Sequence, residues 1–463
     1  MRKYIISICV GLFFFTSCSN WLNVQPKTTV EEEEVFSREL GFKEALTGIY
    51  IKMASGNLYG KNLTVGFMDV LGQRYQMASS AGGYQDPLYY TFPSTLTEDY
   101  TEKIWGDMYN LIANVNNLLY YCDKNKRVFT TESYYEIIKG EALALRAFLH
   151  FDLLRMYGPI DCGSAAERIA YRTEFNRDAK AMQPSRVVMD SIIIDLKTAE
   201  GLLTGTDPLN FEFPEKEVEE EQMKGDRFLT YRHKRLNLYA VKGLLARAYL
   251  YVGNKTDAAK YAREVIESGY FGLVSDEKDI LRSKEILFSI YVDKFNENES
   301  ITRNFSIATK SFFEELFDTA GDGMNDTRVR EGVAFEFGKD AIIMKKYKQE
   351  NLWASTEGTV VLMRLSELYY ILSECEPELA DALYWLNQVR DMRALPSVSC
   401  SADGLLNEIE KEYRKEFYGE GQLFYFYKRH GYKTFLHCPV AELGENNYMF
   451  SWPENEVLFG QTN

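Results

Sequence analysis

The apolar positions of this chain recur mainly at helical spacing. In residues 104–118 and 137–156 they fall three or four positions apart, as along one stripe of an α-helix. The second stretch is apolar on a further face as well, at Ala144, Phe148 and Phe151. A helix that is apolar on two faces packs between neighbouring helices. Residues 36–53 show a similar spacing, so the pattern predicts a mostly α-helical protein with stacked helices.

Two pairs of helical stretches predict antiparallel hairpins of the tetratricopeptide kind, whose repeat is about 34 residues. Residues 238–251 and 256–267 flank a turn at Gly253-Asn254, and residues 363–375 and 379–393 flank a break at Pro377. Small residues such as Gly243 and Ala258 are expected to let the first two helices approach closely.

Residues 56–96 interrupt the helical pattern. They are rich in Gly, Pro and Tyr, which predicts a long loop region. Residues 205–234 and 269–351 are expected to be insertions between helices. The second insertion holds the apolar run 285–291, which predicts a strand.

The first residues predict export. Arg2 and Lys3 precede a short apolar stretch that ends in Phe15-Thr16-Ser17-Cys18, and this stretch is too short to span a bilayer. We expect residues 1–17 to be a signal peptide with a lipobox, and Cys18 to be the lipidated N-terminus. Residues 18–34 then form a tether, and residues 35–463 form a single domain. The alternative is an ordinary secretory signal with an incidental cysteine.

Charge and composition narrow the class of partner. The chain has 53 Lys and Arg against 68 Asp and Glu, a net charge of −15, which argues against nucleic acid as a partner. Aromatic residues make up 14%, with 32 Tyr and 29 Phe. Tyrosine-rich surfaces suit sugars or peptides, because the ring stacks while the hydroxyl still meets water.

Sequence motifs for catalysis or cofactor binding are absent. The chain has no GxGxxG, GxxxxGK[ST], HExxH or GxSxG pattern, and its four histidines are scattered. The cysteines after Cys18 include no CxxC pair, so no metal site is expected. His150 lies in an apolar helix and is expected to be a core residue. Glu141, Glu367 and other carboxylates in helical stretches stand beside arginines and are expected to form ion pairs.

Five segments together resemble the SusD/RagB family of outer-membrane nutrient-binding lipoproteins from Bacteroidetes. The resemblance is specific because the segments fall in the family's order over nearly the whole chain. Residues 18–26 are similar to its post-lipobox segment. The helical elements are carried by Arg146-Ala147-Phe148, Phe151-Asp152-Leu153 and Tyr157-Gly158, then by Arg364 to Glu367, Asn387 to Arg390, and Glu412 to Gly421.

The resemblance implies a fold of four tetratricopeptide-like helical hairpins packed against a loop-rich half with short strands. It also implies a cell-surface lipoprotein of the outer membrane that binds a glycan without catalysis. It would need no cofactor and would deliver the glycan to a TonB-dependent transporter of the SusC kind. The motif residues Glu141, Arg146, Asp152 and Arg155 are assigned to structure.

Composition alone places the glycan site, since the family has no motif for it. Aromatic rings in loops are harder to bury than rings in helices. The candidates in two loop segments are Arg74, Tyr75, Tyr84, Tyr89 and Tyr90, and Tyr291, Phe295 and Asn298. Packing in the core is the alternative for each ring. Two other functions stay open: a glycoside hydrolase with a helical body, and a peptide-binding adaptor that uses the concave repeat surface.

Overall fold

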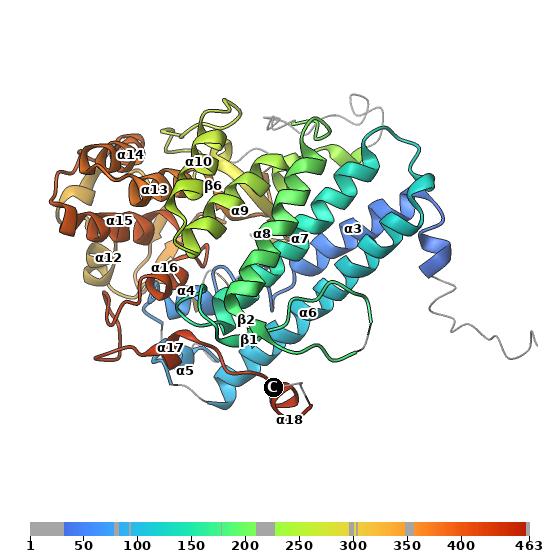
Figure 1. Cartoon of the computed structure of the whole chain (residues 1–463). Coiled ribbons are helices and arrows are strands. Elements are labelled where there is room, and N and C mark those ends of the chain that lie inside the picture. The colour runs from blue at the N-terminus through green and yellow to red at the C-terminus, as the bar shows by residue number, and fades with distance from the viewer. Residues whose placement is uncertain are drawn as a thin grey trace, which may run out of the picture.

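The chain folds into a stack of helices with a loop-rich part along one side (Figure 1). This computed structural model describes residues 32–77, 83–91, 94–176, 178–209, 227–295, 301, 304–347 and 356–459. The expected signal peptide, Cys18 and most of the tether therefore lie outside the described residues. Within this part of the chain, no helix combines the length and the apolar character that crossing a membrane requires.

Eight helices of the described chain build the stack, and they pack against one another in chain order (Figure 1). They are α3 (Glu39–Met53), α6 (Thr95–Lys124), α7 (Tyr134–Tyr157), α8 (Ser185–Leu203), α9 (Leu238–Tyr251), α10 (Lys255–Ile266), α13 (Leu365–Cys375) and α14 (Leu379–Met392). Side chains of Ser94, Asn237 and Asn254 accept hydrogen bonds from the first turns of α6, α9 and α10, and so fix where these helices begin. The expected mostly helical fold is confirmed.

Helix α7 lies at the centre of the stack. Almost every side chain from Ile137 to Tyr157 is buried, as the two apolar faces of this segment predicted. The predicted hairpin over residues 238–267 is also confirmed. The role expected of Gly243 was wrong, however. A methyl group there would lie 2.6 Å from the sulfur of Met363 and 3.3 Å from Leu287. Gly243 therefore allows α9 to approach the β3–β6 sheet, not α10.

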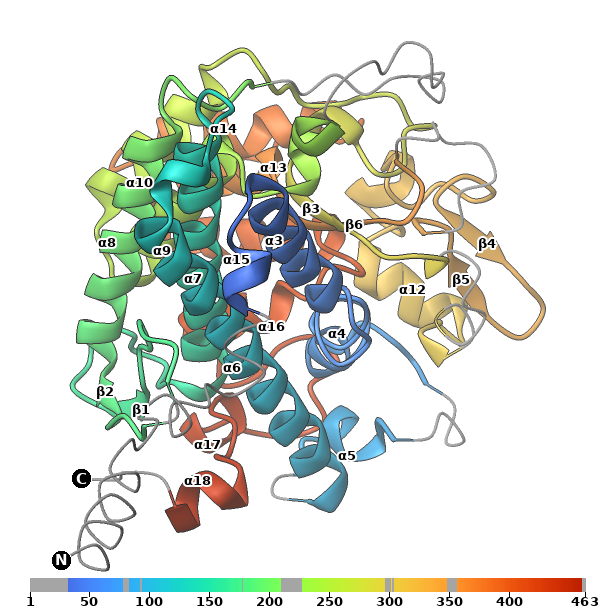
Figure 2. The ribbon, with the colours of Figure 1, turned by 90° about the vertical axis from the view of Figure 1, so that its right-hand side faces the viewer.

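The loop-rich half carries short antiparallel strand pairs (Figure 2). The predicted strand over 285–291 is β3 (Ile286–Tyr291), and it pairs with β6 (Thr359–Arg364). The same half contains a second strand pair, β4 (Phe335–Phe337) with β5 (Ile342–Met344), and the helix α12 (Lys310–Phe317). A third pair, β1 (Glu167–Ile169) with β2 (Gln183–Pro184), lies beside α8.

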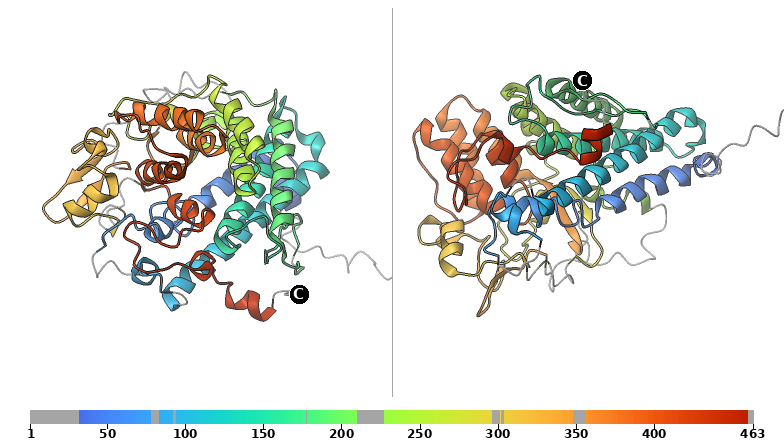
Figure 3. Two further views of the ribbon diagram at one scale, coloured as in Figure 1. Left: turned by 60° about the vertical axis from the view of Figure 1, so that its left-hand side comes forward. Right: turned by 90° about the horizontal axis from the view of Figure 1, so that it is seen from below.

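Two C-terminal helices, α15 (Ala402–Glu416) and α16 (Leu423–Arg429), lie inside the curve of the stack (Figure 3). The short helices α17 (Glu445–Tyr448) and α18 (Glu454–Phe459) follow at the lower edge of the molecule in Figure 1. Helix α16 contacts α4 (Phe67–Leu71), which is followed by α5 (Gln85–Leu88). The described residues of segment 56–96 are thus more regular and more buried than the predicted loop, because the C-terminal helices contact them.

Candidate functional site

Most of the sequence-predicted site residues in the first loop segment are buried. Arg74, Tyr75, Tyr84 and Tyr90 are each at most 4% exposed. Tyr84 stacks on Tyr100, with ring centroids 5.0 Å apart, and its hydroxyl donates to the Asn62 side chain at 2.8 Å. These four side chains leave no face for a ligand, so the structure corrects the expectation that they line an accessible site. The competing interpretation, core packing, holds for them.

The same segment is bonded to residues 414–421, far along the chain. Asp69 accepts the backbone N–H groups of Gly419 at 2.6 Å and Gly421 at 2.9 Å, and the Tyr75 hydroxyl at 3.2 Å. A methyl group on Gly421, whose φ is +69°, would lie 2.4 Å from the carbonyl oxygen of Leu63, so only glycine fits there. Burial raises the pKa of the Asp69 carboxyl to about 6, even though these donors oppose the shift.

Two predicted rings do lie on the surface. Tyr89 is 58% exposed and Tyr291 is 51% exposed, at the ends of α5 and β3. Phe295 is buried against the ring of Tyr347, which corrects its expected role as an accessible ring. Asn298 lies outside the described residues.

Tyr291 is held as part of a small surface patch, which we name the Tyr291 patch and define as Lys234, Tyr291, Asp293 and Glu357. The Tyr291 hydroxyl donates to Asp293 at 3.3 Å, and the Lys234 ammonium lies 5.3 Å from the centre of the ring. The ring packs on Gly358, where a methyl group would approach it to 2.7 Å. Burial lowers the pKa of Lys234 to about 8, against the pull of Glu357. An exposed ring with charged hydrogen-bonding groups beside it can stack on a sugar and bind its hydroxyls.

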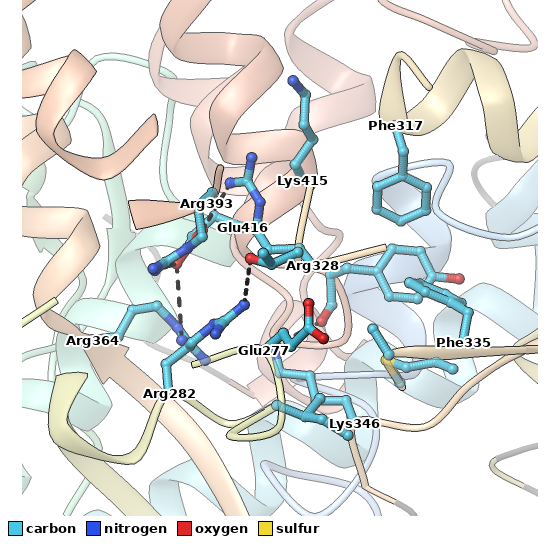
Figure 4. Close-up of a pocket in the computed structure, with 15 residues that line it drawn as sticks. Glu277, Arg282, Phe317, Arg328, Phe335, Lys346, Arg364, Arg393, Lys415 and Glu416 are labelled. Atoms are coloured by element: carbon cyan, nitrogen blue, oxygen red, sulfur yellow. Dashed lines mark hydrogen bonds and ion pairs between the residues drawn. The ribbon is translucent and has the colours of Figure 1, made fainter. Parts of the chain in front are cut away.

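A cavity lies among charged side chains where the loop-rich half meets α15 (Figure 4). Its volume is about 40 Å³, room for a few water molecules and too small for a sugar chain. Arg393 pairs with Glu416 at 2.7 Å and with Glu285 at 2.8 Å, and Arg328 pairs with Glu412 at 2.8 Å. Although burial opposes the shift, Arg328 and neighbouring cations lower the pKa of Glu412 to about 2. We interpret this ion-pair cluster as a structural connection that holds the loop-rich half to the C-terminal helices.

The motif residues of α7 also serve the structure, as expected. Glu141 is fully buried and pairs with Arg232 and Arg235. Arg146 donates to both oxygens of Asp195, at 2.6 and 2.9 Å. Other arginines and carboxylates pair in the same way, among them Asp152 with Arg155, Arg247 with Glu367, and Arg429 with Glu374. The carboxylates beside arginines therefore form ion pairs, as the sequence indicated.

His150 behaves as a core histidine. Its Nδ1 lies 2.8 Å from the carbonyl oxygen of Arg146 and must donate to it, while Nε2 accepts the backbone N–H of Arg172 at 2.9 Å. Both ring nitrogens are used, and burial lowers the pKa to about 3. Over the described ranges, no group of His, Cys, Asp and Glu side chains is arranged to hold a metal ion.

A surface that sequence reasoning missed runs beside α6. Two adjoining hollows, of about 530 and about 730 Å³, lie beside α6. Side chains from residues 170–176 and 178–182 line the opposite side, and Glu32, Glu33 and side chains of α7 also line the larger hollow. We name the two hollows together the α6 groove. Its exposed rings are Tyr120 (56% exposed) and Phe175 (47% exposed). Tyr120 lies outside the stripe of apolar positions that marks the buried face of α6. This position in the sequence could have indicated an exposed ring.

Comparisons with known proteins place this fold in a family. A family model described as "Starch-binding associating with outer membrane" matches residues 20–211, and one described as "SusD family" matches residues 323–453. The SusD-like protein P38 of Formosa agariphila is 22% identical over 516 residues, covering 96% of this chain and 94% of that protein.

Solved structures share the fold. A SusD superfamily protein from Bacteroides thetaiotaomicron has a TM-score of 0.69 at 18% identity, covering 91% of this chain and 98% of that chain. A laminarin-binding SusD-like protein has a TM-score of 0.63 at 20% identity, covering 92% of this chain and 98% of that chain. The two family matches together span well over half of the sequence. The chain belongs to the SusD/RagB family.

Proposed function

We propose that this protein is a cell-surface lipoprotein that captures an oligosaccharide or polysaccharide and delivers it to a TonB-dependent outer-membrane transporter, without cleaving it. Membership in a SusD-like, carbohydrate-binding family carries the proposal. A fold relative whose name states that it binds laminarin supports it. Lipidation at Cys18 would hold the protein at the outer membrane.

The Tyr291 patch is the surface that we propose for the first contact with the glycan. Tyr291 is half exposed, and its ring cannot sink inward because Gly358 and the end of β6 lie directly behind it. A fixed ring loses little conformational freedom when a sugar stacks on it, which favours binding. Lys234, whose ammonium lies over the ring, offers a donor, and Asp293, which accepts from the Tyr291 hydroxyl, offers an acceptor. Tyr89 is a second exposed ring that the sequence indicated, and it stays a candidate.

Binding is tested by affinity electrophoresis of the full-length protein in gels that contain a panel of polysaccharides. We expect retardation by at least one polysaccharide, and weaker retardation of Tyr291→Ala. Tyr384→Ala serves as the control, because Tyr384 is 55% exposed on α14, outside the patch. Equal retardation of Tyr291→Ala and the wild type would place the site elsewhere, and no retardation by any glycan would refute the proposed function.

Three further parts of the proposal each need a separate measurement: the absence of glycan cleavage, the lipid anchor at Cys18, and delivery of the glycan to the transporter. Release of reducing ends from a retarding polysaccharide over several hours would favour the hydrolase alternative. Radiolabelled palmitate should enter the protein in cells and should fail to enter Cys18→Ser. An affinity-tagged protein should copurify with an outer-membrane transporter, and recovery of soluble peptides in its place would favour the adaptor alternative.

A further inference from the structure

The α6 groove is long enough for an extended chain. The hollow beside the first half of α6 includes Trp105, and the hollow beside the second half includes Tyr120. These two residues are 15 positions apart, which on an α-helix corresponds to about 22 Å. The two hollows meet at Asn116, Glu174 and Asn176, which line both. The two hollows therefore adjoin along α6 at these three residues. In Figure 1 the segment between β1 and β2 runs beside α6.

The floor of the groove is fixed by hydrogen bonds between its two walls. The Asn116 side chain donates to the carbonyl of Arg172 at 3.0 Å and accepts from Arg146 at 3.2 Å. The Tyr109 hydroxyl donates to the carbonyl of Ala170 at 3.1 Å. These bonds attach the segment 170–176 to α6 without a ligand, so the groove exists before anything binds. Such preformed grooves favour binding, because the protein loses little freedom.

The charges of the groove are balanced. Five cationic and six acidic side chains line the two hollows. Several are already engaged: Lys124 pairs with Glu33 at 3.1 Å, Lys139 pairs with Asp123, and Arg146 pairs with Asp195 at 2.6 Å. A groove for an acidic polysaccharide or a nucleic acid would show an excess of cations. This groove offers no such excess.

Aromatic rings and polar side chains of the groove can make the contacts that an uncharged ligand needs. Tyr120 and Phe175 present half-exposed rings at one end, and the partly buried Tyr109 and the buried Trp105 line the other. Where the hollows meet, Arg172 donates to Asn176 at 3.0 Å, and Asn176 donates to Glu174 at 2.8 Å. Exposed side chains in such a series of hydrogen bonds can exchange the bonds among themselves for hydrogen bonds to the hydroxyl groups of a sugar. Ring faces and polar side chains along a groove suit a polyhydroxylated, uncharged ligand.

We propose that the α6 groove is a second binding surface, which holds an extended, uncharged polysaccharide chain along α6. It shares no lining residue with the Tyr291 patch. The inference goes beyond the proposed function by adding a site and the chemical class of its ligand. Two surfaces on one protein would let a long chain bind at both and dissociate more slowly than a short one.

The test compares two double variants of the full-length protein in affinity gels. The groove variant is Tyr120→Ala with Phe175→Ala. The control is Tyr270→Ala with Tyr384→Ala, whose rings are 47% and 55% exposed on other surfaces. The gels contain laminarin or starch as uncharged probes, or polygalacturonate as an acidic one. We expect the groove variant to bind an uncharged probe at least tenfold more weakly than the control. Circular dichroism should show the same helix content in both.

Hydroxyl-radical footprinting of the unmodified protein gives a second readout that does not depend on variants. Tyr120 and Phe175 should become protected when a retarding uncharged polysaccharide is added, while Tyr384 should not. Unchanged retardation of the groove variant together with unprotected rings would overturn the groove proposal and leave the proposed function standing. Retardation by polygalacturonate alone would overturn the assigned ligand class. Retardation by no probe of the wider panel would refute both proposals.

Discussion

Arg232→Met tests how far the fold depends on buried charge pairs between distant segments. Arg232 is fully buried and donates to Asp207 through Nε at 2.9 Å and Nη2 at 2.8 Å, and to Glu141 of α7 through Nη1. Both carboxylate side chains are also without exposed surface. Removing the guanidinium would therefore leave buried negative charge with fewer partners.

The magnitude follows from what remains after the change. Glu141 would still accept from Arg235 at 2.9 Å and from Tyr50 at 2.9 Å. Asp207 would retain only the backbone N–H groups of Leu238 at 2.9 Å and Leu209 at 3.2 Å among its described donors. The uncompensated charge is thus mainly that of Asp207. Removing one partner of a buried ion pair costs about 3–5 kcal/mol, and we expect a loss of this size in the free energy of unfolding.

Urea unfolding followed by far-ultraviolet circular dichroism at pH 7 measures the loss. Arg232→Met combined with Asp207→Asn should recover more than half of it, because asparagine removes the charge and can still accept from Leu238. Arg330→Met is the control. Its side chain is 47% exposed and pairs with Glu277 at 2.8 Å, and such surface pairs contribute about 0–1 kcal/mol. A loss below about 1 kcal/mol for Arg232→Met, or a double variant no more stable than the single one, would refute the reasoning.

Three further predictions concern other parts of the fold. Burial raises the pKa of Asp69 to about 6 from 3.8, so ionisation of Asp69 lowers the free energy of unfolding as the pH rises from about 4 to about 6. Asp69→Asn should flatten the plot of this free energy against pH over that range, and an unchanged slope would contradict the raised pKa. Gly358→Ala should lower the melting temperature and weaken glycan retardation, because φ is +62° there and the new methyl group would meet the Tyr291 ring; an unaffected protein would show that the ring is free to move. The buried ammonium of Lys428 donates to the backbone carbonyls of Arg155 and Gly158, each at 2.7 Å, so Lys428→Met should cost about 2–4 kcal/mol in urea unfolding by leaving carbonyls at the end of α7 unpaired. Lys433→Met, at a side chain that is 67% exposed, should be neutral in the same assay.

Much of the helical architecture is determined by the sequence itself. The spacing of apolar residues sets which segments become helices, since 3.6 residues per turn place those positions on one face. The doubly apolar pattern of residues 137–156 indicated that α7 would be buried, and it is. The pairing of arginines with nearby carboxylates could also be inferred, because a charged group in a core needs an opposite charge.

Tertiary structure alone decides which aromatic rings remain accessible. Tyr75, Tyr84 and Tyr90 stand in a Gly-rich segment whose composition is that of a surface loop, yet they are buried. Phe305, Phe435 and residues 414–421 cover the segment, through contacts such as Asp69 with Gly419. No local pattern reports a partner 350 positions away. The α6 groove likewise exists only because the segment 170–176 is bonded beside α6. Periodicity describes one element at a time, whereas burial and hollows belong to pairs of elements that the chain brings together when it folds.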